Sequence, residues 1–69
     1  MDERTKELVG ISASIAAHCQ PCFLYHLKEA KKLQISSEDI NEAISLAKAI
    51  SAAGDENMVK FAERCSKKI

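Results

Sequence analysis

The sequence predicts an all-α fold, a small antiparallel array of about four helices that forms a single domain over residues 1–69. Apolar residues recur along most of the chain at the three- and four-residue spacing of a helix face. No alternating run of β-branched residues bounded by turns is present, so no strand is expected. A chain of 69 residues suffices for one small core and is too short for two domains.

The first helix is expected over residues 2–17, with Asp2 and Glu3 in the first turn, where the helix dipole favours acids. Apolar and small residues follow at helical spacing: Leu8, Gly10, Ile11, Ala13, Ile15 and Ala16. Small residues on this face predict close packing against a neighbouring helix. The helix is expected to break at Ala17 and His18, because Pro21 disfavours helical geometry just before it.

The second helix is expected over residues 20–33, with Pro21 in the first turn, where its missing amide hydrogen leaves no bond unmade. Its apolar stripe consists of Phe23, Leu24, Leu27, Ala30 and Leu33. Ser36 is predicted to cap the third helix, with Asp39 as a weaker capping-box partner.

The third helix is expected to run to Ala53, because Gly54 predicts a stop and Asp55 can cap a new start. Its apolar side consists of Ile40, Ala43, Ile44, Ala47 and Ile50. A fourth helix is expected over residues 56–67. Its core-facing positions are Met58, Phe61, Ala62, Cys65 and Ile69.

Composition excludes several classes of function. Ten basic and ten acidic residues give a net charge of +0, whereas proteins that bind nucleic acid or anionic membranes carry a basic excess. No signal peptide is expected, because residues 1–4 are acidic and mixed in charge and no long apolar run follows. We therefore expect a cytoplasmic protein, and three cysteines, an odd number, disfavour a secreted disulfide framework.

The chemistry of the chain is concentrated in the segment from Cys19 to His26. Two cysteines separated by two residues can close a small disulfide ring, and this spacing recurs in redox motifs. If the helix starts here, both thiols lie at its positive end, which favours thiolate over thiol. His26 follows Cys22 by four residues and therefore shares its helix face. The segment predicts a site for thiol chemistry or for a metal.

Glu7 is a further candidate residue of this site, in addition to the two cysteines and His26. In a straight helix Glu7 would lie about 18 Å from Cys19, at about 1.5 Å per residue. A hairpin at residues 17–18 instead brings Glu7 and His26 to a similar depth. Glu7 is then expected to orient His26, and His26 to accept the proton of Cys22.

The spacing of Glu7, Cys19, Cys22 and His26 resembles the alkylhydroperoxidase D branch of the carboxymuconolactone decarboxylase-like superfamily. The resemblance covers residues 7–53. It implies an all-α protein that self-associates, and the four matched residues as the redox and proton-relay positions. Decarboxylase members typically lack the cysteine pair, so its presence favours a redox role. The sequence departs from the family at Gln34, where a glycine is usual, which predicts a differently made turn.

The resemblance implies a thiol–disulfide oxidoreductase or thiol-dependent peroxidase, an antioxidant enzyme with no bound cofactor. Its substrate is a peroxide or disulfide, and an external thiol reductant restores the Cys19–Cys22 dithiol. Cys22 is expected to be the activated thiol because of its spacing from His26, with the reverse assignment open because Cys19 lies nearer the helix start.

Two other functions remain open from the residues. The first is a small zinc-binding helical module with Cys19, Cys22 and His26 as three ligands. Its fourth ligand would be one of His18, Cys65 and Glu7. The second is a non-catalytic assembly subunit that retains the motif.

A homo-oligomer is expected for each of these functions. Hydrophobic residues make up 46% of the chain, and apolar stripes on every predicted helix present more apolar surface than one small bundle can bury. The resemblance implies a trimer or a multiple of it, with the thiol site near a subunit boundary.

Overall fold

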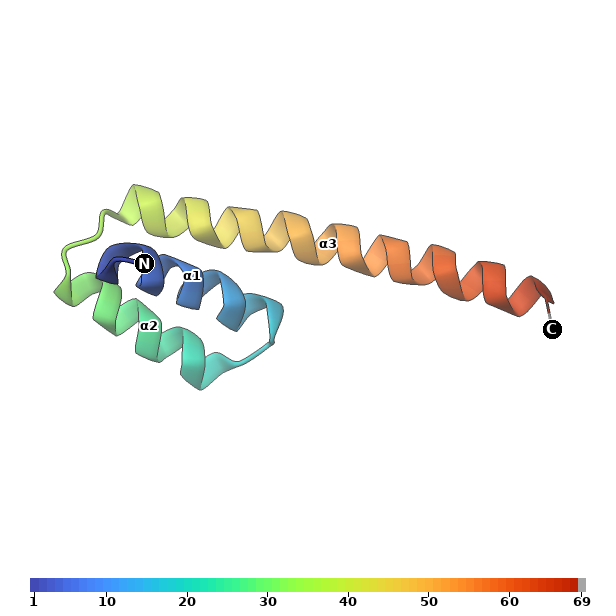
Figure 1. Ribbon diagram of the computed structural model, residues 1–69, viewed down its shortest axis with the longest axis horizontal. Helices are drawn as coiled ribbons and strands as arrows, with labels where there is room; N and C mark the ends of the chain where they lie inside the picture. Colours follow the sequence, from blue (N-terminus) through green and yellow to red (C-terminus); the bar gives the residue numbers. More distant parts are fainter. Residues whose placement is uncertain (69) are drawn as a thin grey trace.

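The computed structural model describes residues 1–68, which form three α-helices: α1 (Glu3–Ala16), α2 (Gln20–Lys32) and α3 (Ser37–Lys68). Helices α1 and α2 form an antiparallel hairpin, and α3 lies alongside α1, runs in the same direction as α1 and extends far past its end (Figure 1). Residues 1–68 contain no strand, which confirms the predicted all-α class. No helix among these residues is both long and apolar enough to cross a membrane.

The prediction of a fourth helix is wrong, because α3 continues through Gly54 to Lys68. Glycine ends a helix where the backbone turns left-handed, but no glycine in the described chain has a positive φ. Within a helix, glycine instead lowers stability by about 1 kcal/mol relative to alanine, which good helix formers on either side can offset.

Capping side chains mark the starts of α1 and α3: the predicted cap Ser36 is present, and Asp2 caps α1, whereas Asp55, expected to cap a new start, lies within α3. The Asp2 carboxylate accepts a hydrogen bond from the Thr5 amide at 2.7 Å, and this bond lowers the pKa of Asp2 below its ordinary value. The Ser36 hydroxyl accepts a bond from the Asp39 amide at 3.1 Å at the start of α3. Asp2 therefore precedes α1 as its N-cap instead of lying within the first turn.

The α1–α2 and α2–α3 connections have the same backbone conformation. Helix α1 ends with His18 at a φ of 56°, and α2 ends with Gln34 at a φ of 58°. In each case the left-handed residue and the next residue donate their amides back into the last turn, the arrangement of a Schellman motif. The turn at Gln34 is therefore made in the left-handed way that suits glycine, and the prediction of a different turn is wrong.

The core lies where α1 packs between α2 and α3. Its buried members are Ile11, Ala30, Ile35 and Ile40, with Leu8, Ile15, Phe23, Leu27, Ala43 and Ile44 packed around them. All of these residues lie in the first two thirds of the chain. The hydrophobic core therefore fixes the α1–α2 hairpin, which carries the predicted thiol site, against the first half of α3.

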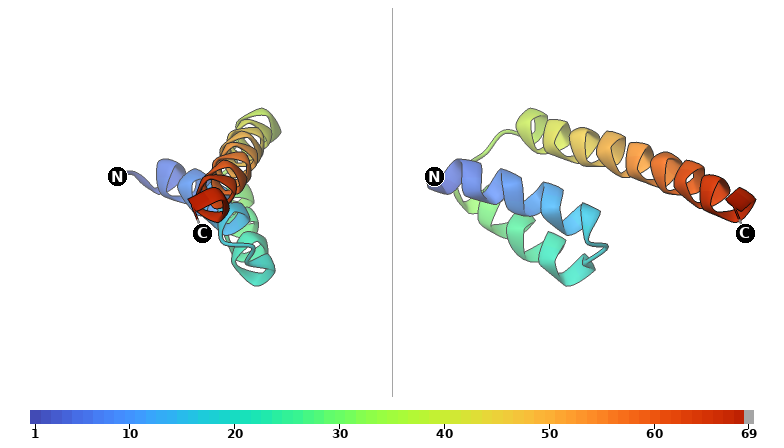
Figure 2. Two further views of the ribbon diagram at one scale, coloured as in Figure 1. Left: turned by 90° about the vertical axis from the view of Figure 1, so that its right-hand side faces the viewer. Right: turned by 45° about the vertical axis from the view of Figure 1, so that its right-hand side comes forward.

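The second half of α3 extends away from this core (Figure 2). The radius of gyration is 15.6 Å, whereas a compact domain of this length has about 11 Å. The predicted core positions Met58, Phe61, Ala62 and Cys65 in this half are exposed and therefore wrong, and Ile50 at the end of the first half is exposed as well. Ile69 lies outside the described residues. Helical periodicity identifies an apolar side of α3, but within one chain nothing in residues 1–68 covers it beyond Ala47.

Candidate active site

The two cysteines of the motif form a disulfide at the start of α2. Their Cα atoms lie 5.3 Å apart, with Cys19 as the N-cap and Pro21 in the first turn, as predicted. The Cys19 sulfur accepts a hydrogen bond from the Cys22 amide at 3.3 Å, so one of the free amides of the helix start points at this sulfur. Cys22 is exposed and Cys19 is partly buried.

The backbone of Cys19 is tied to both helices of the hairpin. Its amide donates to the Ser14 carbonyl at 2.9 Å, and its carbonyl accepts from the Phe23 amide at 3.1 Å. The left-handed backbone at His18 makes the first of these bonds, which closes the end of α1. The position of the dithiol relative to α1 is therefore set by main-chain bonds.

Glu7 and His26 meet across the hairpin, as the sequence predicts. Oε1 of Glu7 lies 2.7 Å from Nδ1 of His26. The Glu7 side chain is 8% exposed and that of His26 is 27% exposed, so the contact is largely shielded from water. An ionised carboxylate accepts only, so with Glu7 in that form the contact requires the hydrogen on Nδ1 and leaves Nε2 of a neutral imidazole as an acceptor.

The structure does not join His26 to the sulfurs by a hydrogen bond in the disulfide form. His26 and Cys22 lie on α2 four residues apart, so they share a helix face, and the disulfide commits the Cys22 sulfur to Cys19. The site thus combines an exposed cysteine, a histidine one turn further along the helix, and a shielded carboxylate that contacts the histidine.

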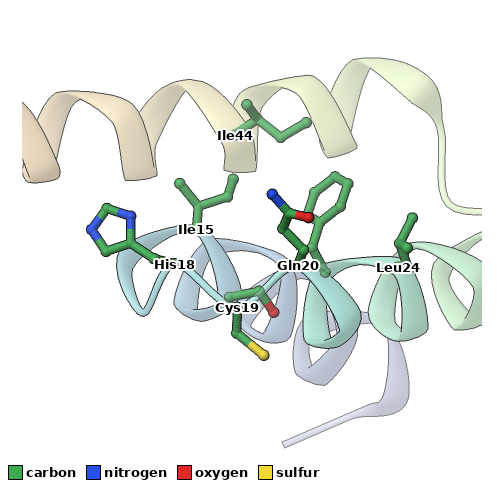
Figure 3. A pocket seen from close by; sticks show the side chains of 8 residues that line it. Ile15, His18, Cys19, Gln20, Leu24 and Ile44 are labelled. Atoms are coloured by element: carbon green, nitrogen blue, oxygen red, sulfur yellow. The ribbon is translucent and has the colours of Figure 1, made fainter.

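An open apolar hollow lies beside the disulfide, between the start of α2 and α3 (Figure 3). It has a volume of about 570 Å³ and is lined by Ser14, Ile15, His18, Cys19, Gln20, Phe23, Leu24 and Ile44. The Cys19 sulfur points away from Ile44 and from this hollow (Figure 3). The hollow therefore borders the backbone side of the motif, and the sulfur faces the other side of the hairpin.

The alternative zinc ligands Cys19, Cys22 and His26 do not form a metal site in this disulfide form. Residues 1–68 contain no group of three or more histidine, cysteine, aspartate or glutamate side chains placed to hold one metal ion. Cys65 is exposed near the far end of α3, so its predicted place in the core is wrong. His18 is exposed in the connection between α1 and α2, as expected of a turn residue, and lines the hollow.

Sequence reasoning missed one contact of the site. Gly10 was predicted only to allow close helix packing, yet the residue packed against it is His26. The available signal was its spacing, because Gly10 follows Glu7 by three residues and therefore lies on the same face of α1.

Comparison with known proteins gives one match. A family model described as the carboxymuconolactone decarboxylase family matches residues 1–64. The match covers α1, α2 and most of α3, and it confirms the resemblance predicted from the sequence. Searches among curated proteins and among solved structures found no match.

Proposed function

Because the chain belongs to the carboxymuconolactone decarboxylase family, we propose that it is a thiol–disulfide oxidoreductase or thiol-dependent peroxidase of the alkylhydroperoxidase D type. The observation that carries the proposal is the joint placement of three groups at the α1–α2 hairpin. These are the Cys19–Cys22 pair at a helix start, His26 one turn on, and Glu7 bound to His26. Cys19, Cys22, His26 and Glu7 are the proposed catalytic residues.

With a peroxide, the proposed first step is attack by the Cys22 thiolate on one peroxide oxygen. The O–O bond breaks, the Cys22 sulfur becomes a sulfenic acid, and the other oxygen leaves as an alcohol after gaining a proton. The Cys19 thiol then attacks the sulfenic sulfur and releases water. The products are one alcohol, one water and the Cys19–Cys22 disulfide. Cys22 is assigned as the attacking residue because it is exposed and lies four residues before His26.

The proposed role of His26 is to accept the proton of the attacking thiol at Nε2. Glu7 fixes the tautomer by accepting from Nδ1 and stabilises the imidazolium that forms, because the new positive charge lies 2.7 Å from the carboxylate oxygen. Glu7 is nearly fully buried, so little water screens this pair.

A reductant must return two electrons to the disulfide in each cycle. We propose that an external thiolate attacks the exposed Cys22 sulfur and that Cys19 leaves as a thiolate. The amide of Cys22 points at the Cys19 sulfur, and the helix start stabilises the negative charge that appears there. The cytoplasm, where thiols are kept reduced, is the compartment in which we propose this cycle operates.

Turnover with a chemical reductant tests the proposal. Purified protein is mixed with cumene hydroperoxide or an oxidised dithiol and excess dithiothreitol, and substrate consumption is followed. Cys19→Ser and Cys22→Ser should abolish turnover, whereas Cys65→Ser, at the distant end of α3, should retain it. Equal turnover in all three variants, or none in the unaltered protein with either substrate class, contradicts the proposal and favours a non-catalytic assembly subunit.

We further propose that the protein is a homo-oligomer, a trimer or a multiple of it. An apolar groove lies between α1 and the first half of α3, with Val9, Leu46 and Ile50 about half exposed or more. The exposed apolar residues Met58, Val59 and Phe61 continue along the second half of α3. A second copy of the chain is the proposed cover, because burial of this surface supplies the core that the extended end of α3 lacks within one chain.

A further inference from the structure

Gly10 lies directly against the imidazole of His26. A Cβ atom placed on Gly10 would lie 2.5 Å from Nδ1, 2.6 Å from Cγ and 2.7 Å from Cε1 of that ring. Non-bonded carbon atoms rest about 3.5 to 4.0 Å apart, so even a methyl group does not fit between the ring and the backbone of α1. The ring occupies the space that any other residue at position 10 would fill.

No backbone requirement explains this glycine. Gly10 is in the interior of α1, and no glycine in the described chain has a positive φ. Glycine is among the least favourable residues in a helix interior. What it permits here is the close approach of a side chain from α2.

That close approach coincides with the Glu7–His26 contact. Glu7 and Gly10 are three residues apart and therefore neighbours on one face of α1. The same nitrogen, Nδ1, that lies 2.7 Å from Glu7 is the atom that a Cβ at position 10 would strike. A ring pushed off Gly10 therefore loses its place beside the carboxylate.

We propose that Gly10 is a positioning residue for the thiol chemistry, one whose missing side chain lets His26 reach Glu7 and present Nε2 as the base. The inference rests on the proposed function, because it assigns Gly10 a part in activating the thiol. Gly10 contacts neither substrate nor sulfur in this account, and it acts through His26 alone.

The test compares Gly10→Ala with Gly54→Ala, which adds the same methyl group to α3 at a position where nothing beyond the adjacent residues and the local helix backbone lies within 4 Å of the new Cβ. Gly54→Ala should raise the urea midpoint and leave the rate of dithiol oxidation unchanged. Gly10→Ala should slow oxidation at pH 7 by roughly a hundredfold or more, the range of a lost general base. The oxidation rate of Gly10→Ala should return to that of the unaltered protein at alkaline pH, where the thiolate forms unaided. A wild-type pH profile in Gly10→Ala overturns the proposal.

The His26→Ala background separates positioning from a general loss of structure. With the ring removed, alanine at position 10 has room, so Gly10→Ala should then raise the urea midpoint and leave the rate unchanged. If Gly10→Ala unfolds the parent and the double variant folds like His26→Ala, the clash is located at the ring and the proposal stands. Equal losses of stability in both backgrounds would contradict it.

A spectroscopic measurement reads the contact without any turnover. In the disulfide form, Glu7→Gln should shift the ring resonances of His26 and leave those of exposed His18 in place. In the Gly10→Ala background the same substitution should leave His26 unshifted. If the protein shows no turnover but Glu7→Gln still shifts the His26 resonances in the Gly10 parent alone, only the proposed function is refuted. If Glu7→Gln shifts the His26 resonances in Gly10→Ala as well, the positioning role of Gly10 is refuted.

Discussion

Glu7 on α1 and His26 on α2, nineteen residues apart in the chain, are in contact through Oε1 and Nδ1 at 2.7 Å. The contact exists because the chain reverses at His18 and because Gly10 lets the ring lie against α1. It supplies a buried acceptor for one ring nitrogen, and the other nitrogen is the one that the proposed relay uses as a base. The proposed thiol chemistry depends on this pair.

Glu7→Gln should slow oxidation of the dithiol at neutral pH by roughly ten- to a hundredfold, less than the roughly hundredfold or more of a lost general base, because His26 itself remains. The amide keeps the shape of the side chain but cannot stabilise an imidazolium by charge. His26→Ala should also slow oxidation of the dithiol at neutral pH. Stopped-flow rates across about pH 6 to 9 should converge on the wild-type rate at the alkaline end, since a free thiol ionises near pH 8.5.

Glu3→Gln is the matched control for the charge, because Glu3 is an exposed carboxylate on the same helix. It should leave the rate unchanged at every pH. Identical rates for Glu7→Gln and the unaltered protein across the whole range would show that no relay operates.

Gln34→Gly should stabilise the fold by about 1 kcal/mol, because a left-handed backbone costs a residue with a Cβ roughly this much. The φ of 58° is already the one that glycine adopts freely. Gln34→Ala keeps the Cβ and should therefore leave the stability of the fold unchanged. Urea unfolding of the two variants measures the difference, and equal midpoints would mean that the turn is unstrained.

Asp2→Ala should lower stability at neutral pH, and its effect should fade in acid. The folded-state pKa of Asp2 is lowered by the bond from the Thr5 amide, so its contribution is full above the unfolded pKa. That contribution is lost as the pH falls through the lower, folded value, in a window below about pH 4. Urea midpoints at pH 7 and pH 2.5 compare the variants, and Asp2→Asn, which retains the cap without titrating, should show no such fading.

Assembly is tested at Leu46, which is 59% exposed in the groove between α1 and α3. The unaltered protein should sediment as a multiple of its 7.6 kDa chain mass at micromolar concentration. Leu46→Arg should shift the equilibrium to monomer, because a buried unpaired charge opposes association. Lys48→Glu, two residues on and exposed, should leave it unchanged. A single species of monomer mass in the unaltered protein contradicts the proposed oligomer.

The sequence predicted the hairpin and its contacts because those depend on local chemistry. Asp2 and Ser36 are strong capping residues, and Pro21 fixes the start of α2. Helical spacing then placed Glu7 and His26 at similar depths around the reversal, and the structure brings them together.

The wrong predictions concern positions where packing against the rest of the protein, and not the local sequence, determines the conformation or burial of a residue. Gly54 and Gln34 were both interpreted from glycine preferences, yet Gly54 stays helical and Gln34 turns left-handed. A single glycine ends a helix only if the following residues gain more by packing elsewhere, and the residues after Gly54 are exposed within one chain. Cys65 and Phe61 have core-like spacing without a core, because periodicity identifies an apolar face and does not say whether the same chain covers it.

Counting thiols after oxidation tests the central claim most directly. The protein is reduced, freed of reductant and any bound metal, and treated with one equivalent of hydrogen peroxide or of an oxidised dithiol. We expect two of the three thiols to disappear together and peptide mapping to find them joined as Cys19–Cys22, with Cys65 still free. Three thiols left intact, or a disulfide that involves Cys65, would contradict it.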